Sequence, residues 1–254
     1  MSPSRLVDVA DGFDVVAERY DLMVAINPGY HRHLLLSARR LRLGGPSPSG
    51  RGRLRLLDLG CGTGLSTAAL LRAYPGAEVV GVDTSAGMLA RARAKSWPAG
   101  VRFVQAKAEE VAEALAGEGI ADGLDGALAA YLVRNVPDRD GLLATVCALL
   151  APGAPLAVHE YSVADSRRAR WTWTVVCRGV VVPAGWVVQR HTALYRYLER
   201  SVLGFDGIAE FEARMTGAGL VDVTSLPMTG WQRGIVHTFL GRRPAEVPSR
   251  WPAG

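Results

Sequence analysis

The sequence predicts an α/β fold in which a seven-stranded, mostly parallel sheet is covered by helices. Short apolar runs alternate with segments of helical spacing from residue 54 to residue 162, a pattern typical of a parallel sheet wrapped by helices. A turn with three alternating glycines follows the first of these runs. The last two apolar runs follow one another closely and predict an antiparallel hairpin at the edge of the sheet.

The individual elements follow from the spacing of their apolar residues. We expect strands at residues 54–59, 78–82, 101–105, 126–131, 156–161, 221–228 and 234–243. We expect helices at residues 65–73, 86–95, 109–116, 140–150 and 207–218. The alternation breaks at residues 163–205, which are rich in aromatic residues and valine, and we interpret this segment as a helical lid insertion.

We interpret residues 1–254 as a single domain. Residues 13–43 have helical spacing, and the stretch "GGPSPSGRGR" that follows them is a flexible linker by composition. The successive parts are a helical cap with its linker, a core, the lid insertion, a C-terminal helix with edge strands, and a tail, at residues 1–53, 54–162, 163–205, 206–243 and 244–254.

Composition narrows the class of protein. The net charge is +5, but no run of Lys or Arg marks a nucleic-acid groove. Three separated cysteines without CxxC spacing argue against a disulfide framework and a metal site, and favour a reducing compartment. The N-terminus lacks the pattern of a secretory signal, and the apolar run at 174–188 is too short to span a bilayer. We therefore expect a cytoplasmic protein.

The glycine-rich turn indicates a ligand that touches backbone. Gly60, Gly62 and Gly64 fit G-x-G-x-G, whereas the dinucleotide fingerprint needs a glycine where Leu65 stands. The Lys-Ser/Thr of a phosphate-binding P-loop is also absent. The carboxylate of Asp58 beside this turn disfavours a pyrophosphate and suits an ammonium group, so the expected ligand is a nucleoside that carries an amino acid.

A second acidic residue supports a nucleoside ligand. Asp83 ends the second predicted strand, where a carboxylate can accept both hydroxyls of an unphosphorylated ribose. Met88, one turn into the next helix, is placed to pack on adenine. In this order and spacing, the motifs resemble those of class I S-adenosylmethionine-dependent methyltransferases over residues 54–162. The resemblance implies a Rossmann-like fold, S-adenosylmethionine as cofactor, and further contacts from Tyr20, Cys61, Thr63, Thr84, Lys107, Ala108, Glu109 and Ala130.

Other stretches resemble one family in particular. "YLVRNVPDRDGLLATVCALLAPGAPLAVHEYS" at 131–162 resembles the "GLRNV-x-D … L-x-PGG" region of the UbiE/MenG/Coq5 family. "FDVVAERYDLMVAINPGYHR", "YRYLERSV" and "TGWQRGIVHTFLGRR" resemble further motifs of that family, so the resemblance covers nearly the whole chain. It implies methylation of a ring carbon of a quinol that carries a prenyl tail.

Four positions depart from the family pattern, one of them Val24, which stands where the family has the Asn of its "MN" motif. Lys107 stands where the family has an Asp or Asn that accepts from the adenine amine, and an ammonium cannot accept. Either Lys107 points to solvent while the N–H of Ala108 holds adenine, or cofactor binding is weaker. Leu132 replaces a glycine and is expected to narrow the methyl-transfer cleft, and Ala154 replaces a second glycine.

Carbon methylation mainly requires that a phenolate be positioned and stabilised. We expect Arg134 to hold the substrate oxygen, with a surface ion pair to Asp138 as the alternative. Asn135 is expected to orient the ring or a water molecule. Glu160 either assists deprotonation through water or bonds backbone, and His31 either enters the pocket as a base or lies exposed.

The lid insertion supplies aromatic residues for a lipophilic acceptor. We expect substrate contacts from Tyr131, Tyr161, Trp171, Trp173, Trp186 and Tyr195, with a simple core role as the alternative for the tryptophans. The predicted function is C-methylation of a polyprenylated quinol or a related lipophilic aromatic. The alternatives are a tailoring methyltransferase of secondary metabolism and a non-catalytic protein of the same fold. Peripheral contact with the inner membrane face and a homodimer are both open, and no nucleic acid is expected.

Overall fold

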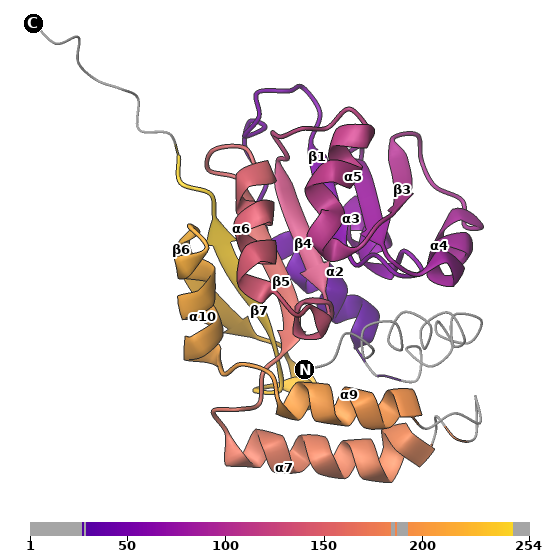
Figure 1. The fold of residues 1–254 in the computed structure, drawn as a ribbon, viewed down its shortest axis with the longest axis vertical. Coiled ribbons are helices and arrows are strands. Elements are labelled where there is room, and N and C mark those ends of the chain that lie inside the picture. Colours follow the sequence, from indigo (N-terminus) through magenta and orange to yellow (C-terminus); the bar gives the residue numbers. More distant parts are fainter. Residues whose placement is uncertain (1–26, 28, 184–185, 187–192, 246–254) are drawn as a thin grey trace, which may run out of the picture.

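A single sheet of seven strands forms the centre of the computed structural model, which describes residues 27, 29–183, 186 and 193–245 (Figure 1). Its strand order is β3-β2-β1-β4-β5-β7-β6. The strands are β1 (Arg55–Leu59), β2 (Glu78–Asp83), β3 (Val101–Gln105), β4 (Gly126–Ala130), β5 (Pro155–Tyr161), β6 (Val221–Pro227) and β7 (Val236–Arg242). The first five pair in parallel, and β7 runs antiparallel to both β5 and β6. The predicted fold class is confirmed.

The helices lie close to their predicted positions. They are α2 (Tyr30–Arg40), α3 (Leu65–Ala73), α4 (Ala86–Arg93), α5 (Val111–Gly117), α6 (Arg139–Leu149), α7 (Arg167–Val176), α9 (Ala193–Leu203) and α10 (Ile208–Gly217). Shorter turns are η1 (Ala108–Glu110), η2 (Val133–Asn135), the π-helix η3 (Cys177–Val181) and η4 (Gly230–Gln232). The helix expected at 109–116 therefore begins with a separate 3-10 turn. The part of the predicted N-terminal helix before residue 27 lies outside the described residues.

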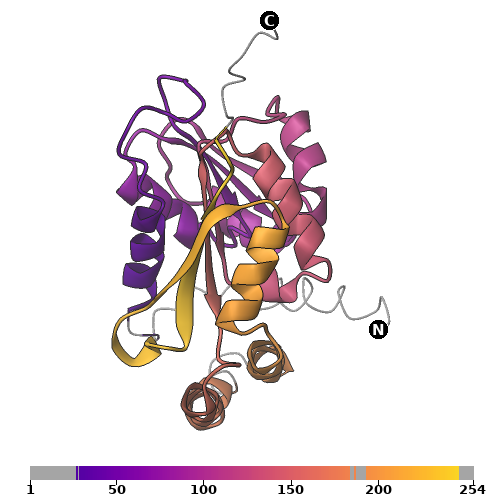
Figure 2. The same cartoon turned by 90° about the vertical axis from the view of Figure 1, so that its left-hand side faces the viewer.

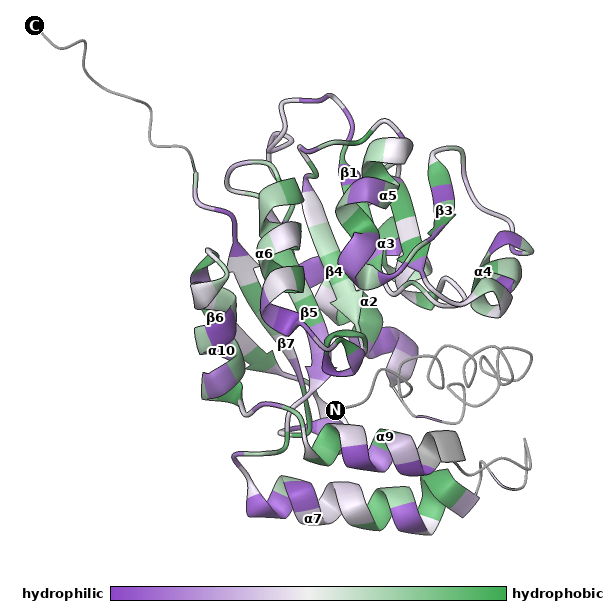
Figure 3. Cartoon of the chain, in the orientation of Figure 1, coloured by the Kyte–Doolittle hydropathy of each residue, from purple (hydrophilic) through white to green (hydrophobic). Residues whose placement is uncertain are grey.

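Helices cover both faces of the sheet (Figure 2). The α2 and α3 helices pack on one face around Leu34, Leu56 and Leu70. The α5, α6 and α10 helices pack on the other face in a larger cluster that includes Leu57 and Phe211. The central strands β1, β2, β4 and β5 are buried along most of their length because both faces are covered, whereas the edge strands β3 and β6 are more exposed (Figure 3).

The lid insertion is helical, as predicted, and lies at the edge where the parallel strands end (Figure 1). After β5 the chain enters α7 and η3 and returns through α9. A third apolar cluster joins these helices to the sheet through contacts among Tyr161, Trp173, Val202 and Ile235. In open α/β sheets this edge is where ligands bind.

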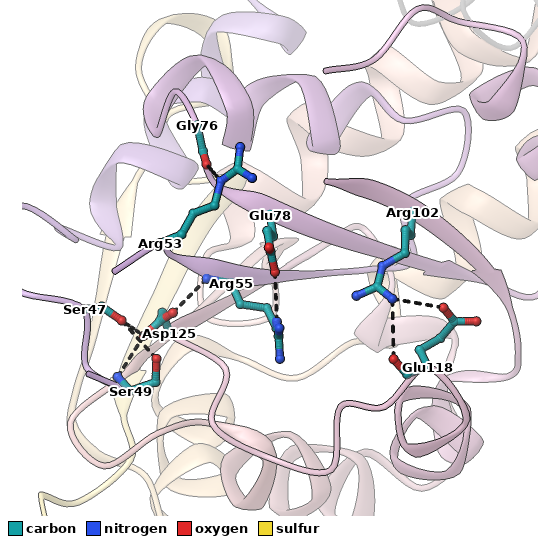
Figure 4. Close-up of polar contacts among 9 residues, drawn as sticks. All are labelled: Ser47, Ser49, Arg53, Arg55, Gly76, Glu78, Arg102, Glu118 and Asp125. Carbon is teal, nitrogen blue, oxygen red and sulfur yellow. Dashed lines mark hydrogen bonds and ion pairs between the residues drawn. The ribbon is translucent and has the colours of Figure 1, made fainter. Parts of the chain in front are cut away.

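The linker at 44–53 was expected to be flexible, but Asp125 holds it against the opposite edge of the sheet (Figure 4). Its Oδ1 accepts hydrogen bonds from the Ser47 hydroxyl at 2.5 Å and from the Ser49 N–H at 2.8 Å. Its Oδ2 accepts from the Arg55 N–H at 2.7 Å. The carboxylate thereby ties the linker to the start of β1, a contact between distant residues that composition does not reveal.

Candidate active site

The glycine-rich loop joins β1 to α3 in a conformation that needs its glycines. Gly60, Gly62 and Gly64 have φ angles of 72°, 53° and 86°, in the left-handed region. A Cβ on Gly64 would lie 2.7 Å from the indole of Trp97, and one on Gly60 would lie 3.0 Å from Leu132. By contrast, no atom lies within 4 Å of a Cβ built on Gly62. The loop therefore leaves open space beside Gly62, where a ligand can approach the backbone.

Asp58 lies beneath this loop with one oxygen left for a ligand. The side chain is fully buried, and its Oδ2 accepts hydrogen bonds from the hydroxyls of Ser66 at 2.8 Å and Thr67 at 2.5 Å. Its Oδ1 is buried and has no hydrogen-bond partner among the described residues. Burial raises the pKa of Asp58 to about 7. A buried carboxylate with an unused acceptor fits a cationic donor such as an ammonium group.

Asp83 ends β2 on the other side of the loop. Its Oδ2 accepts from the Gly62 N–H at 2.8 Å, and its Oδ1 accepts from the Ser85 N–H at 2.9 Å. The carboxylate is half-buried at the end of β2. Its position agrees with the sequence analysis, and its contact with a ribose stays a prediction.

The remaining predicted cofactor residues that the structure describes differ in their exposure. The side chain of Lys107 is 68% exposed, and its Nζ lies 3.6 Å from Glu110 Oε1. Lys107 therefore points to solvent, as in the first alternative, and the contact of the Ala108 N–H with adenine stays a prediction. Ala108 is half-buried at the start of η1, and Thr84 and Glu109 are exposed. Met88 is buried. Tyr20 lies outside the described residues.

A small cavity of about 30 Å³ borders the loop. Cys61, Thr63 and Ala130 line it together with Tyr30 and Leu34 of α2. The thiol of Cys61 lies against β2, because a Cβ on Gly81 would lie 2.9 Å from its sulfur. Burial raises the pKa of this thiol, so it remains protonated.

Arg134 and Glu160 form a buried ion pair at the ends of η2 and β5. Arg134 Nη1 donates to Glu160 Oε1 at 2.7 Å and to the carbonyl of Tyr131 at 2.8 Å. Glu160 also accepts from the N–H of Tyr161 at 2.9 Å. Burial lowers the pKa of Arg134, but the charge and hydrogen bond of Glu160, together with the nearby Tyr161 and Tyr197, outweigh burial and leave the pKa above its ordinary value. The expected alternative partner, Asp138, instead accepts from Gly141 N–H and caps α6.

Asn135 connects the η2 turn to helix α9 of the lid insertion. Its Oδ1 accepts a hydrogen bond from the hydroxyl of Tyr197 in α9 at 3.1 Å, and its Nδ2 donates to the carbonyl of Tyr131 at 3.3 Å. Tyr131 itself has a φ of 57°, which is uncommon for a residue with a side chain. The contacts from Arg134 and Asn135 to its carbonyl therefore hold a strained turn.

Four aromatic rings form a continuous row from the loop to the lid. The ring centroids of Tyr30 and Tyr131 are 5.6 Å apart, those of Tyr131 and Tyr161 are 4.9 Å apart, and those of Tyr161 and Trp173 are 4.6 Å apart. The row begins at the small cavity and ends on α7. Three of the predicted substrate residues are thus brought together, and Tyr30 is a member that the sequence analysis missed.

The other predicted residues lie apart from this row. Trp171 and Trp186 are 68% and 64% exposed. Tyr195 belongs to α9, but its side chain is not described. His31 is exposed on the first turn of α2, with its ring 5.8 Å from that of Tyr30. Its expected role as a base has no supporting contact among the described residues.

A buried polar network beside the row was also missed. The hydroxyl of Ser37 in α2 lies 2.8 Å from Nδ1 of His159 and 2.7 Å from the hydroxyl of Thr238. The ring of His159 packs edge-on against Tyr131 at 4.7 Å. Burial lowers the pKa of His159 to about 3, so the ring is neutral. Strand alternation places His159 on this face but does not reveal its partners, which come from distant parts of the chain.

A larger cavity of about 690 Å³ lies between the start of α7 and the η4 turn. Arg168, Trp231, Ile235 and His237 are among its lining residues. Within the described ranges, no cluster of three or more potential metal ligands exists. Likewise, no helix in those ranges is long and apolar enough to cross a membrane.

Comparison with known proteins agrees with this geometry. The chain matches the model of the ubiE/COQ5 methyltransferase family over residues 2–242. It is 35% identical over 235 residues to the ubiquinone/menaquinone biosynthesis C-methyltransferase UbiE of Syntrophotalea carbinolica, covering 91% of this chain and 92% of the relative. It is 34% identical over 166 residues to the demethylmenaquinone methyltransferase of Thermus thermophilus, covering 65% of this chain and 73% of the relative.

Among solved structures, human N-acetylserotonin methyltransferase in complex with S-adenosylmethionine is similar in fold. The TM-score is 0.55 at 15% identity, covering 90% of this chain and 56% of that one. The family match spans the glycine-rich loop, both acidic residues and the lid insertion. The chain therefore belongs to the ubiE/COQ5 methyltransferase family and is an S-adenosylmethionine-dependent methyltransferase.

Proposed function

We propose that this methyltransferase transfers a methyl group to a ring carbon of a prenylated quinol. The observation that carries the proposal is the aromatic row from Tyr30 through Tyr131 and Tyr161 to Trp173. The rings are mostly buried, with Tyr131 partly exposed, and together they form an apolar wall against which a flat aromatic acceptor and an apolar tail would pack. The relatives named as quinone-biosynthesis methyltransferases support the same class of acceptor.

The cofactor site fits S-adenosylmethionine. Asp58 Oδ1, buried and unpaired among the described residues, would accept from the ammonium group of the methionine part. The carboxylate of Asp83 would hold the ribose, and the N–H of Ala108 would contact the adenine edge. When bound, the cofactor supplies an electrophilic methyl group on its sulfonium. The acceptor must then be bound, oriented and kept from water by residues of the chain.

In this proposal, Arg134 and Glu160 are positioning residues. Glu160 balances the charge of Arg134, and both side chains are nearly withdrawn from solvent. The guanidinium lies 5.5 Å from the centroid of Tyr161 and 5.9 Å from that of Tyr131, so the pair fixes two rings of the row. Asn135 and Tyr197 connect the same loop to the lid, which would exclude water from a phenolate acceptor. His31 stays a candidate proton acceptor.

The proposal is tested by comparing acceptors. The purified protein is given S-adenosylmethionine with a short-chain demethylmenaquinol, the same ring without its tail, or a small phenol, and products are identified by mass spectrometry. We expect a C-methylated product and the highest kcat/KM for the prenylated ring. Preferred O- or N-methylation of the small phenol would indicate a tailoring enzyme. Cofactor binding without transfer to any acceptor would indicate a non-catalytic protein.

Two tryptophans of the same helix provide a matched pair of variants. Trp173→Ala removes a ring of the row, whereas Trp171→Ala removes an exposed one. We expect Trp173→Ala to raise KM for the prenylated acceptor about tenfold more than for the tail-less one, because the lost contact is apolar area. Trp171→Ala should leave this ratio unchanged. Equal effects of Trp173→Ala on both acceptors would contradict a tail contact at this residue.

A further inference from the structure

The positive charge of the chain is concentrated in the lid insertion. Residues 163–205 contain seven arginines and two acidic residues, an excess of five positive charges. The rest of the chain contains 22 basic and 22 acidic side chains, so the insertion accounts for the whole net charge of +5. One of the two acids, Glu199, is buried and pairs with Arg178 at 2.8 Å. The other, Asp165, accepts a hydrogen bond from the N–H of Ile208.

The same segment exposes large apolar side chains. Four of the six that are exposed in the described part of the chain lie here: Trp171, Val175, Val180 and Trp186. Their exposed fractions are between 47% and 68%. Ala169, Trp173 and Cys177 of the same helical segment are buried in the apolar cluster with Tyr161. The α7–η3 segment thus packs one side against the protein and leaves tryptophan and valine on the other.

These side chains lie on the outer boundary of the molecule. The α7 helix, on which the aromatic row ends, is farther from the sheet than α9 in both views (Figures 1 and 2). Hydrophilic residues gather at the N-terminal end of α7 and hydrophobic ones toward its C-terminal end (Figure 3). Arg167, Arg168 and Arg170 are exposed at the first end. No other described segment covers this outer face.

We propose that the outer face of α7 and η3 docks on the surface of an anionic lipid bilayer. Interfacial helices combine arginines, which attract anionic headgroups, with tryptophan and aliphatic side chains, which enter the boundary region. Charge complementarity favours this occupant, because a second copy of the chain would bring the same excess of arginines to the contact. The inference deepens the proposed function: docking would place the end of the aromatic row beside the phase in which a prenylated acceptor resides.

Vesicle binding tests this inference without any acceptor. Co-sedimentation is measured with phosphatidylcholine vesicles that contain or lack phosphatidylglycerol, over a series of salt concentrations. We expect binding only when the anionic lipid is present, and weaker binding as salt rises. Comparable binding to neutral vesicles, or no binding to anionic vesicles at low salt, would overturn the proposal.

Two charge variants distinguish vesicle binding through the docking face from binding that depends only on the net charge of the protein. The test variant carries Arg167→Gln, Arg168→Gln and Arg170→Gln, and the control carries Arg39→Gln, Arg51→Gln and Arg72→Gln, which are exposed elsewhere. Both lose three positive charges. Because each arginine near an anionic surface contributes a similar increment, the test variant should bind about 100-fold more weakly than the wild type. The control should bind nearly as the wild type does, and equal losses in both variants would overturn the assignment to α7.

Fluorescence quenching tests whether the exposed tryptophans of the lid insertion enter the bilayer. Brominated lipids quench tryptophans that enter the bilayer, and we expect quenching in the wild type that Trp171→Ala with Trp186→Ala abolishes. Quenching that persists in this variant would overturn the assignment.

Sedimentation velocity shows whether the outer face of α7 and η3 instead joins two copies of the chain. A dimer that the arginine variant dissociates would also overturn the proposal. A tail-less acceptor without vesicles should be methylated equally by the arginine variant, so failure of the proposed function remains distinguishable.

Discussion

Arg134 Nη1 donates to Glu160 Oε1 at 2.7 Å in a pair whose side chains are 5% and 0% exposed. The pair couples the end of β5 to the strained turn at Tyr131, which carries one ring of the aromatic row. Each charge is compensated almost entirely within the protein. This relationship governs what substitutions at the two positions should do.

Breaking the ion pair from one side should destabilise the protein strongly. Arg134→Met leaves the carboxylate of Glu160 buried without its partner, which typically costs about 3–5 kcal/mol of the free energy of unfolding. The double variant Arg134→Met with Glu160→Met should recover most of this loss in urea denaturation. Its KM for the acceptor should nevertheless rise, because the carbonyl of Tyr131 loses a donor. If kcat alone collapsed in a stable double variant, Arg134 would act on the reacting atoms.

Cofactor binding should depend on the protonation of Asp58. With a pKa of about 7, the carboxyl is mostly ionised near pH 8 and mostly protonated near pH 6. Since a cationic amino group requires the carboxylate, S-adenosylmethionine should bind about tenfold more weakly at the lower pH. Calorimetry across this range measures the effect. Asp58→Asn should bind weakly at every pH, and a wild-type affinity that does not change with pH would contradict the assignment.

Asp58 also affects the stability of the protein, which should fall as pH rises, whereas cofactor binding should strengthen. The folded state keeps the proton of Asp58 between about pH 4 and about pH 7, where the unfolded state has lost it. The free energy of unfolding of the cofactor-free protein should therefore fall as pH rises through this window. Asp58→Asn should remove that contribution to the slope, as measured by urea denaturation at several pH values.

Substitutions of Asp83 and Lys107 should have very different effects on cofactor affinity. Asp83→Ala removes a charged acceptor for two hydroxyls and should weaken cofactor binding by about 2–3 kcal/mol. Lys107→Asp should change it by less than about 0.5 kcal/mol, because the lysine side chain is exposed and directed to Glu110. Calorimetry on both variants checks this. Tighter binding by Lys107→Asp would show that the side chain reaches the adenine edge.

Leu132 should influence which acceptors fit. Its side chain lies 3.0 Å from the Cβ position of Gly60, at the mouth of the glycine-rich loop. Leu132→Ala would widen the cleft, so the ratio of kcat/KM for a two-ring over a one-ring acceptor should rise by about tenfold. Gly60→Ala serves as the contrasting variant, since its added methyl group meets Leu132 and should impair cofactor binding. An unchanged ratio in Leu132→Ala would place the acceptor elsewhere.

Asp125 should make the attachment of the linker sensitive to acid. Burial raises the pKa of Asp125, but hydrogen bonds from Ser47, Ser49 and Arg55 outweigh this and hold it below its ordinary value. Its contribution to stability is therefore present above about pH 4 and is lost as pH falls through the folded pKa. Asp125→Ala should cost about 2–3 kcal/mol at neutral pH, since two backbone N–H groups lose their acceptor. Urea denaturation at neutral and acidic pH measures both effects.

Local sequence patterns were sufficient to predict the architecture and the position of the glycine-rich loop. Alternating apolar runs predict the strands because burial on both faces of a parallel sheet requires continuous apolar stretches. The placement of the G-x-G-x-G turn, Asp58 and Asp83 could be predicted because it depends on residues that are neighbours in sequence or that end adjacent strands. Their contacts with the cofactor stay predictions. Strand alternation by itself also places the side chains of His159 and Glu160 on opposite faces of β5.

Tertiary structure decided the roles that depend on distant partners. Arg134 pairs with Glu160 rather than with nearby Asp138, and His159 meets Ser37 across 122 residues. Lys107 stands at a position where the resemblance implies a cofactor contact, but its side chain lies in solvent. Of the tryptophans predicted to line the acceptor site, Trp173 is buried, whereas Trp171, two positions earlier on the same helix, is exposed. The sequence determines which charged and aromatic side chains are present. Their burial and their partners depend on how the helices pack on the sheet, and these two factors determine how strongly each group interacts.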